Sequence, residues 1–284
     1  MASVSSARRR HSAPVVPLPT GTTRRISGPP RLQLKKKVTL VSKFDTVLFG
    51  RDVEVKRGCI LHDDKLILCG VDNYVYICNP DGKRSNRISV QFTPSDIALF
   101  DEKRAVVSGE KGYQIIDIET LKAGPLVKPG GICTAVACTK DNIVVANDYC
   151  KLTYLTINGE TVKSFNTTHS PLTMTGSQDG FIYWTTWDND EVHYIDPTGT
   201  ERFFFASPDL QDPVGVSVDK KGDVFVIGHK SNNVHKITHE GNTDKIVLKE
   251  SNGVKMPSGM AISPKKSELM IINDKKSISI FKIQ

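Results

Sequence analysis

Short apolar runs separated by turn residues recur along most of the chain, and this pattern is repeated six times, about every 40 residues. The two clearest copies begin with Pro-x-Gly, at Pro213 and Pro257. Weaker copies start near Gly58, Pro94, Gly131 and Pro171. The last four intervals between starts are 37 (94 to 131), 40 (131 to 171), 42 (171 to 213) and 44 (213 to 257) residues. A fixed period of this size is typical of an array built from one supersecondary unit.

The runs within each copy have the length and composition of β-strands. They are rich in Val, Ile, Tyr and Phe, too short for helices, and bounded by Asn, Asp and Gly. In the fifth copy the four runs are Val214–Val218, Asp223–Ile227, Asn233–Ile237 and Lys245–Leu248. Turns such as Asn158-Gly159 tolerate positive φ and are expected to close hairpins between third and fourth strands. Four antiparallel strands per copy make a propeller blade, so the pattern predicts an all-β, six-bladed β-propeller.

The two ends of the repeat region predict how the ring closes. The sixth copy stops at Gln284 after its third strand, and an open ring would expose two sheet edges. Val38–Val41 is the one candidate for the missing strand, so we expect the N-terminal strand to complete the last blade. A seven-bladed ring is the alternative, but no seventh copy is found. The predicted domains are therefore a disordered, basic, Pro/Ser/Arg-rich tail at 1–37 and a propeller at 38–284.

The charge lies mainly in the tail. The whole chain is +7; residues 1–37 hold nine Lys/Arg and no acid, which leaves 29 Lys/Arg against 31 Asp/Glu, a net charge of −2, in residues 38–284. A near-neutral propeller gives little basis for a nucleic-acid footprint. The six cysteines form no Cys-x-x-Cys, which favours buried, reduced thiols in a cytoplasmic protein. The sequence has no secretory signal or membrane span, and a mitochondrial presequence is the alternative reading of the tail.

The fifth copy, PVGVSVDKKGDVFVIGHKSNNVHKI, resembles the NHL repeat of six-bladed propellers. The fourth and sixth copies match it in register, and copies one to three match in strand pattern alone. The family usually has Asp at the end of the second strand, where this chain has Thr186, Gly228 and Asn273. The nearest relatives look like divergent NHL-type propellers of tripartite-motif proteins.

This resemblance implies a non-catalytic binding or scaffold module that selects a protein target, in the manner of the targeting propeller of the ubiquitin pathway. The chain lacks the closely spaced Cys/His ligands of a RING or B-box, so it is not expected to be a ubiquitin ligase or another enzyme by itself. A stand-alone propeller, a splice form and a fragment all remain open. No cofactor and no metal are expected.

One face of the propeller is expected to bind the partner, through loops that join second to third strands. Trp187 is the leading candidate, because a Trp in a polar turn is typical of a binding hot spot. Packing of this ring over the neighbouring blade is the alternative. The predicted partner-binding residues are Trp187, Asp188, His229, Lys230, Tyr149, Asp72 and Lys111.

Two other functions remain as alternatives. Single-stranded RNA binding needs a basic groove with aromatic platforms, for which Tyr149 and Trp187 qualify, although the loop charges are mixed. A metal-dependent propeller enzyme of the lactonase or amidating-lyase kind needs convergent ligands at the channel mouth. The seven histidines fall at unlike positions of different copies, with no two predicted at equivalent places, and His193 and His235 fit ordinary alternating strand positions.

The tail contains two copies of Arg-Arg-x-Ser-x-Pro, centred on Ser12 and Ser27. Basic residues before a serine attract basophilic kinases, and the phosphorylated motif resembles a 14-3-3 ligand. We therefore expect regulated phosphorylation of these serines; a solvated linker is the alternative.

Overall fold

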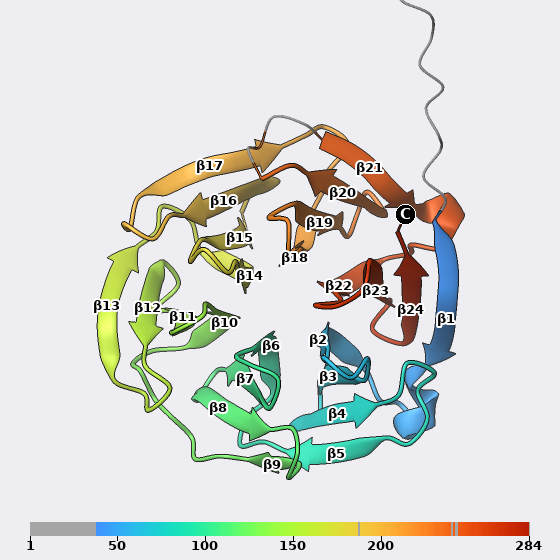
Figure 1. Ribbon diagram of the computed structural model, residues 1–284, viewed down its shortest axis with the longest axis horizontal. Helices are drawn as coiled ribbons and strands as arrows, with labels where there is room; N and C mark the ends of the chain where they lie inside the picture. Colours follow the sequence, from blue (N-terminus) through green and yellow to red (C-terminus); the bar gives the residue numbers. More distant parts are fainter. Residues whose placement is uncertain (1–37, 187, 240, 242–243, 284) are drawn as a thin grey trace, which may run out of the picture. The chain divides into compact units, whose positions relative to one another are not determined.

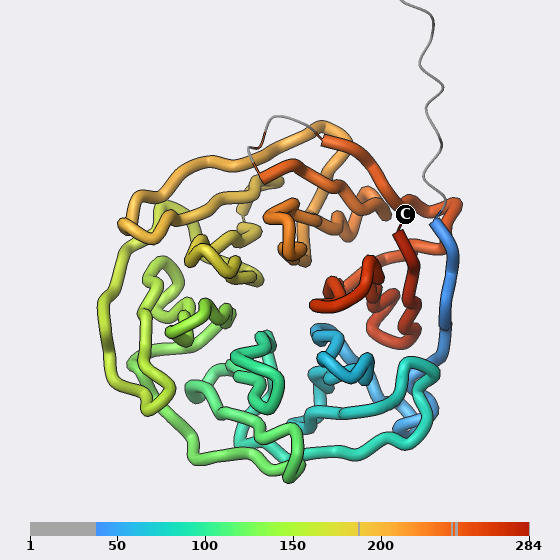
Figure 2. Tube along the Cα trace, viewed as in Figure 1, coloured from blue at the N-terminus to red at the C-terminus, as the bar shows by residue number. Residues whose placement is uncertain are grey.

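Six four-stranded antiparallel sheets stand around a common axis, each with its strands in order from the centre outward (Figure 1). The structure is a computed structural model that describes residues 38–283 apart from 187, 240, 242 and 243. The chain passes once around the ring, so that its first and last described segments lie side by side (Figure 2). The predicted all-β, six-bladed propeller is confirmed. Residues 1–37, with Ser12 and Ser27, lie outside the described part of the chain.

The strands of the six blades follow in chain order, from the innermost strand of each blade to the outermost. Blade 1 consists of β2 Val55–Ile60, β3 Leu66–Gly70, β4 Tyr74–Cys78 and β5 Asn86–Ser89. Blade 2 consists of β6 Pro94–Leu99, β7 Arg104–Gly109, β8 Gly112–Asp117 and β9 Lys122–Ala123. Blade 3 consists of β10 Cys133–Cys138, β11 Ile143–Asn147, β12 Lys151–Leu155 and β13 Thr161–Asn166.

The second half of the ring has the same construction. Blade 4 consists of β14 Pro171–Gly176, β15 Ile182–Thr186, β16 Glu191–Ile195 and β17 Glu201–Ala206. Blade 5 consists of β18 Pro213–Val218, β19 Val224–Gly228, β20 Asn233–Ile237 and β21 Asp244–Lys249. Blade 6 consists of β22 Pro257–Ile262, β23 Glu268–Asn273, β24 Ser277–Lys282 and, from the start of the chain, β1 Thr39–Asp45. Two short 3-10 helices, η1 Thr46–Phe49 and η2 Glu250–Asn252, lie in connections.

The N-terminal strand closes the ring. β1 pairs antiparallel with β24, from Thr39 opposite Lys282 to Asp45 opposite Ser277. The prediction that this strand completes the last blade is confirmed, and the strand extends beyond the predicted Val38–Val41. This pairing covers the edge that β24 would otherwise expose, and it ties the two ends of the repeat region together.

The hydrophobic core is divided into six clusters of described residues, one between each pair of neighbouring blades. The second strands β3, β11, β15 and β19 are buried along their whole length, whereas the outermost strand β13 alternates between half-buried and exposed positions. Each blade therefore buries both faces of its inner strands against its neighbours, and a closed ring is the arrangement that leaves no inner face uncovered.

Each innermost strand begins with a β-bulge. The shift in register follows the first residue, which is Pro in four blades, and the next paired residue is Gly215 in blade 5 and Gly259 in blade 6. The Pro-x-Gly motif therefore marks the start of the innermost strand of the blade, which lines the channel of the ring. The innermost strands of the first and third copies begin at Val55 and Cys133, a few residues from the predicted Gly58 and Gly131. Neither copy has the Pro that marks the start elsewhere, so the sequence does not fix these two boundaries.

The ring has two chemically different ends. We call one the loop end: it holds the connections from second to third strands and from each blade to the next. We call the other the turn end: it holds the turns from first to second strands. A cavity of about 390 Å³ opens at the turn end, lined by the carboxyl-terminal halves of the innermost strands and by those turns.

Candidate functional site

The residues predicted to bind a partner are distributed around the loop end, and Trp187 lies outside the described residues. Asp72 accepts a hydrogen bond from the Tyr76 hydroxyl at 2.5 Å in blade 1, and Nζ of Lys111 donates to the Gln91 carbonyl at 3.4 Å in blade 2. Tyr149 extends into solvent from the connection after β11, and the residue is 63% exposed.

The other three predicted residues belong to blades 4 and 5, and the structure brings their turns together. The Asp212 backbone N–H donates to Asp190 at 2.7 Å, and Nζ of Lys230 lies 3.8 Å from Oδ2 of Asp212. Nδ1 of His229 lies 2.8 Å from the Pro257 carbonyl oxygen, which links blade 5 to blade 6. Asp188, His229 and Lys230 therefore lie on adjoining turns.

Large apolar side chains are exposed at the loop end. Val71 and Tyr149 follow second strands, and Ile132 and Met256 precede innermost strands. In the part of the chain that the structure describes, no large apolar side chain is exposed in the six turns at the other end. Exposed apolar groups gathered on one side of a molecule are typical of an interaction surface.

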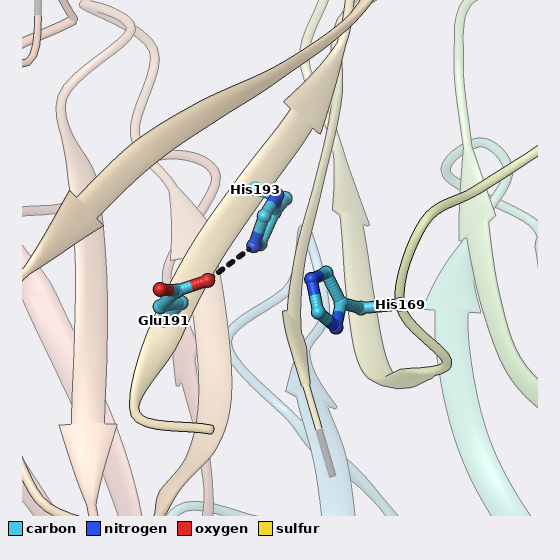
Figure 3. A group of neighbouring side chains, drawn as sticks. All are labelled: His169, Glu191 and His193. Carbon is cyan, nitrogen blue, oxygen red and sulfur yellow. Dashed lines mark hydrogen bonds and ion pairs between the residues drawn. The ribbon is translucent and has the colours of Figure 1, made fainter. Parts of the chain in front are cut away.

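Blade 4 also contains a group of potential metal ligands at the loop end, which we call the blade 4 cluster: His169, Glu191 and His193 (Figure 3). One ligand atom from each residue lies within 4.8 Å of the others. Glu191 and His193 are on β16, and Oε2 of Glu191 lies 2.9 Å from Nε2 of His193. His169 comes from the connection between β13 and β14, and its ring centroid lies 5.1 Å from that of His193.

Three neighbouring groups surround this cluster. Oδ2 of Asp188 lies 3.2 Å from Nδ1 of His169, so a residue predicted for the partner face contacts the cluster directly. Oε1 of Glu201, on β17, lies 3.7 Å from Nδ1 of His193. The Asn189 side-chain amide donates to Oε2 of Glu191 at 3.0 Å.

The structure corrects the sequence reading of the histidines. In blades 4 and 5 the second pair after the bulge joins the innermost strand to Trp184 and to Val226, respectively. His193 lies opposite Trp184 on the third strand and His235 lies opposite Val226, so the two histidines occupy equivalent places. This place holds a buried residue with a polar group in every blade: Tyr76, Gln114, Thr153, His193, His235 and Ser279. In blade 5 the ring of His235 contacts Oδ1 of Asp244 at 2.8 Å and the Asp209 carbonyl at 3.4 Å, a local structural role.

The floor of the turn-end cavity is formed by a buried ion pair, which we call the channel pair: Arg57 and Asp96. Nε of Arg57 lies 3.9 Å from Oδ1 of Asp96. Asp96 accepts backbone hydrogen bonds from Ile97 at 3.0 Å and from Val136 and Met174 at 3.3 Å, and Nη1 of Arg57 donates to the carbonyls of Lys56 and Ser258. Together these two side chains join the innermost strands of blades 6, 1, 2, 3 and 4.

The burial of the channel pair changes the pKa of both groups. Burial raises the pKa of Asp96 to about 6, although Arg57 and the backbone donors lower it. Burial also lowers the pKa of Arg57, opposed by Asp96. The corresponding places in the other blades are held by Ala135, Thr173, Gly215 and Gly259, which are small enough to leave room for the pair.

Sequence reasoning missed both clusters. The Glu191-x-His193 spacing, which puts two side chains on one face of a strand, was a usable signal for half of the blade 4 cluster. His169 lies 22 positions before Glu191 (169 to 191), in a connection, and no local pattern brings it to β16. The alignment of Arg57 with Asp96 depends on the bulge, which the sequence does not mark in blade 1.

Comparisons with known proteins agree on the fold. Neither a family model nor a curated protein sequence matches the chain. A Bacteroides thetaiotaomicron protein of unknown function has a similar structure, with a TM-score of 0.69, 14% identity, and coverage of 87% of this chain and 76% of that one. A streptogramin B lyase is similar with a TM-score of 0.60 and 16% identity, over 85% of this chain and 87% of the lyase.

A third similar structure is the β-propeller domain of Cps50 (Swd1) from Myceliophteria thermophila, with a TM-score of 0.62 and 11% identity over 81% of this chain and 83% of that one. These neighbours include an enzyme and a propeller domain, so at such identities the likeness establishes the propeller fold alone. Among the described residues no helix is long and apolar enough to cross a membrane. All six cysteines are free.

Proposed function

We propose that this propeller is a non-catalytic binding module that recognises a protein partner through its loop end. The observation that carries the proposal is the exposure of Tyr149, Ile132, Val71 and Met256 on connections at this end, whereas the described turns at the other end expose no large apolar side chain. An exposed aromatic ring with polar neighbours is typical of a binding hot spot.

The backbone conformation around Tyr149 favours exposure of its side chain to solvent over packing in the core. Tyr149 has a φ of 66° and Asp148 a φ of 51°, a left-handed conformation that is uncommon for residues other than glycine. The Asn147 side chain donates to the Gly130 carbonyl at 3.0 Å, and Gly131 leaves no room for a Cβ beside the Asp148 carboxylate. The connection that carries Tyr149 is thereby held against the one that carries Ile132. Such strained, well-supported positions occur often at binding sites.

The charges at the loop end favour a protein partner over RNA. Acidic residues such as Asp72, Asp188 and Asp212 alternate with Lys111 and Lys230, whereas an RNA-binding groove needs a predominantly basic surface. The resemblance of the fifth copy to NHL repeats also supports a protein partner. In its more specific form, the proposal is that the chain acts as the targeting propeller of a tripartite-motif-type assembly.

The experiment is quantitative affinity capture with the full chain and four variants. Tyr149→Ala and Trp187→Ala each remove a candidate anchor, and Ile132→Ser makes an exposed apolar position polar. Val162→Ala is the matched control, because Val162 is an exposed apolar residue of the same blade, on the outermost strand β13. We expect a defined set of proteins to be retained by the parent chain and by Val162→Ala, and lost with Tyr149→Ala.

Nuclease treatment and a salt titration separate the RNA alternative. Capture that persists after nuclease treatment supports direct protein binding. Capture that disappears with nuclease, and falls steeply with salt, would replace the proposal with RNA binding. Equal capture by the parent, Tyr149→Ala and Ile132→Ser would place the interaction elsewhere on the ring and overturn the proposal.

A further inference from the structure

We propose that blade 4 binds a transition-metal ion, Zn²⁺ in the first instance, through His169, Glu191 and His193. This inference rests on the geometry of the cluster and not on the proposed function. The site lies at the loop end, away from the cavity at the turn end.

The donor set selects the class of ion. Two imidazole nitrogens and one carboxylate oxygen are the ligands that Zn²⁺ and neighbouring transition metals prefer, whereas Ca²⁺ and Mg²⁺ take oxygen ligands. Oε1 of Glu191 accepts no hydrogen bond from the described residues, so this oxygen is available to an ion while Oε2 keeps its bond to Asn189.

The positions of the donors fit an ion after small side-chain movements. In a tetrahedral zinc site with bonds of about 2.0–2.2 Å, ligand atoms lie about 3.3–3.6 Å apart. The three donor atoms of the blade 4 cluster already lie within 4.8 Å of one another. His169 and Glu191 are each about one-third exposed, so both retain the rotamer freedom needed to close this difference.

The surroundings of the cluster carry an excess of negative charge. Asp188 and Glu201 contact the two histidines, and Glu191 belongs to the cluster itself. In the described part of the chain, no Lys or Arg forms an ion pair with any of these three carboxylates. A divalent cation would offset this charge, and Asp188, 3.2 Å from Nδ1 of His169, is placed to orient that ring from outside the group of three ligands.

The connection that supplies His169 is fixed in place by its own hydrogen bonds. The Thr168 backbone N–H and hydroxyl donate to the two carboxylate oxygens of Glu201 at 2.8 and 2.7 Å. The Thr167 backbone N–H donates to the Cys150 carbonyl at 2.8 Å. A ligand held by such outer contacts loses less freedom on binding, which is how metal sites are commonly supported.

Blade 5 provides an internal contrast. His235 occupies the place equivalent to His193, but its ring nitrogens contact one carboxylate and one backbone carbonyl, and among the described residues it belongs to no group of three potential ligands. The place equivalent to Glu191 holds Asn233, whose side-chain amide donates to the Asp209 carbonyl at 2.6 Å. The potential for metal binding is therefore an addition to blade 4 and not a property of the repeat.

The test is Zn²⁺ titration of the chelator-treated full chain by isothermal calorimetry, with Co²⁺ as a spectroscopic probe of coordination. His169→Asn and Glu191→Gln are the test variants, because both side chains are partly exposed and their replacement leaves the buried His193 in place. His229→Asn is the matched control, a histidine at the same end outside the cluster. Mg²⁺ and Ca²⁺ serve as oxygen-seeking comparisons.

We expect one Zn²⁺ per chain, a visible Co²⁺ spectrum of the four-coordinate type, and no heat with Mg²⁺ or Ca²⁺. Each test variant should weaken Zn²⁺ binding by about 100-fold, as loss of a ligand or its support commonly does, and His229→Asn should not. The inference is overturned if the parent chain binds no Zn²⁺, or if it binds Zn²⁺ with equal affinity in the parent and in both test variants.

Discussion

The channel pair and the blade 4 cluster are both groups of ionisable side chains within a mainly apolar fold, but their hydrogen-bonding differs. Asp96 is fully buried and accepts bonds from three backbone N–H groups as well as from Thr173. In the blade 4 cluster His193 is buried, whereas His169 and Glu191 reach solvent, and one oxygen of Glu191 has no partner among the described residues. The Asp96 carboxylate is satisfied internally, although Nε of Arg57 is buried without a hydrogen-bond partner among the described residues. The blade 4 cluster has a carboxylate oxygen left for a ligand.

This difference separates a structural role from a binding role. A buried carboxylate whose acceptors are occupied by several strands holds those strands together, and it offers nothing to a ligand. In a half-exposed group of histidines and carboxylates, acidic side chains outnumber basic ones. Such a group contributes little to the stability of the fold until an ion binds. The same amino-acid types therefore lead to opposite expectations, which mutation can test.

The largest expected effect comes from breaking the channel pair. Asp96→Ala leaves Arg57 buried without its counter-ion and removes the acceptor for the backbone N–H groups of Val136 and Met174. We expect the free energy of unfolding to fall by about 3–5 kcal/mol, measured by urea denaturation. His169→Ala without metal should change it by less than about 0.5 kcal/mol. Equal losses in the two variants would remove the distinction between the groups.

The pH dependence of stability tests the channel pair without breaking it. The pKa of Asp96 is raised from 3.8 to about 6 in the folded chain, so the folded state binds more protons than the unfolded state in this interval. The contribution of Asp96 to stability is therefore fully present below pH 4 and declines as pH rises to about 6. The total decline corresponds to about 3 kcal/mol at 1.36 kcal/mol per pKa unit.

The comparison with Asp96→Asn isolates this effect, because the pKa values of exposed carboxyls such as Asp101 are lowered and act in the opposite direction in both proteins. We expect the stability of the parent relative to Asp96→Asn to fall by about 2–2.5 kcal/mol between pH 4 and pH 7, because part of the total is already lost at pH 4. A relative stability that stays constant or rises with pH would mean that Arg57 and the backbone donors outweigh burial.

Zn²⁺ should stabilise the chain through blade 4. An ion that binds the folded state alone adds about 2.7 kcal/mol at a free concentration 100 times its Kd. We expect a corresponding rise in the melting temperature of the parent and of His229→Asn, and none for His169→Asn. A rise that is equal in all three proteins would assign the stabilisation to other ligands.

The smallest expected effect is at the exposed anchor. Tyr149→Ala removes a ring that contributes little to the core, so the free energy of unfolding should change by less than about 0.5 kcal/mol, in either direction. Equilibrium denaturation of this variant beside the parent makes the measurement. A loss above 2 kcal/mol would identify Tyr149 as a packing residue and weaken its assignment to the partner surface.

The fold could be predicted from the sequence because strand length, turn chemistry and repeat spacing all agree. The incomplete sixth copy also predicted the pairing of β1 with β24, since one apolar run was left over. The starts of the first and third copies differ from the predicted ones by a few residues. Val55 and Cys133 stand where other copies have Pro, so the bulge that sets the register has no mark in the sequence there.

The sites were harder to predict because they depend on contacts between copies. Asp96 and Arg57 lie 39 positions apart (57 to 96), and the carboxylate of Asp96 is completed by backbone N–H groups that carry no side-chain signal at all. His169 reaches β16 through a connection whose course depends on Glu201. The partner-face residues could be assigned to one end of the ring from the strand order alone, whereas their contacts and exposure could not.

The most direct test of the binding-module account is a hydrogen-exchange footprint of the chain in complex with the partner that it captures. The account predicts slowed exchange in the connections of the loop end, including the segments around Tyr149 and Ile132, with the turns 61–65 and 219–223 unchanged. Protection confined to the turn end, around the cavity above Asp96, would contradict it and would indicate instead a ligand bound on the axis of the ring.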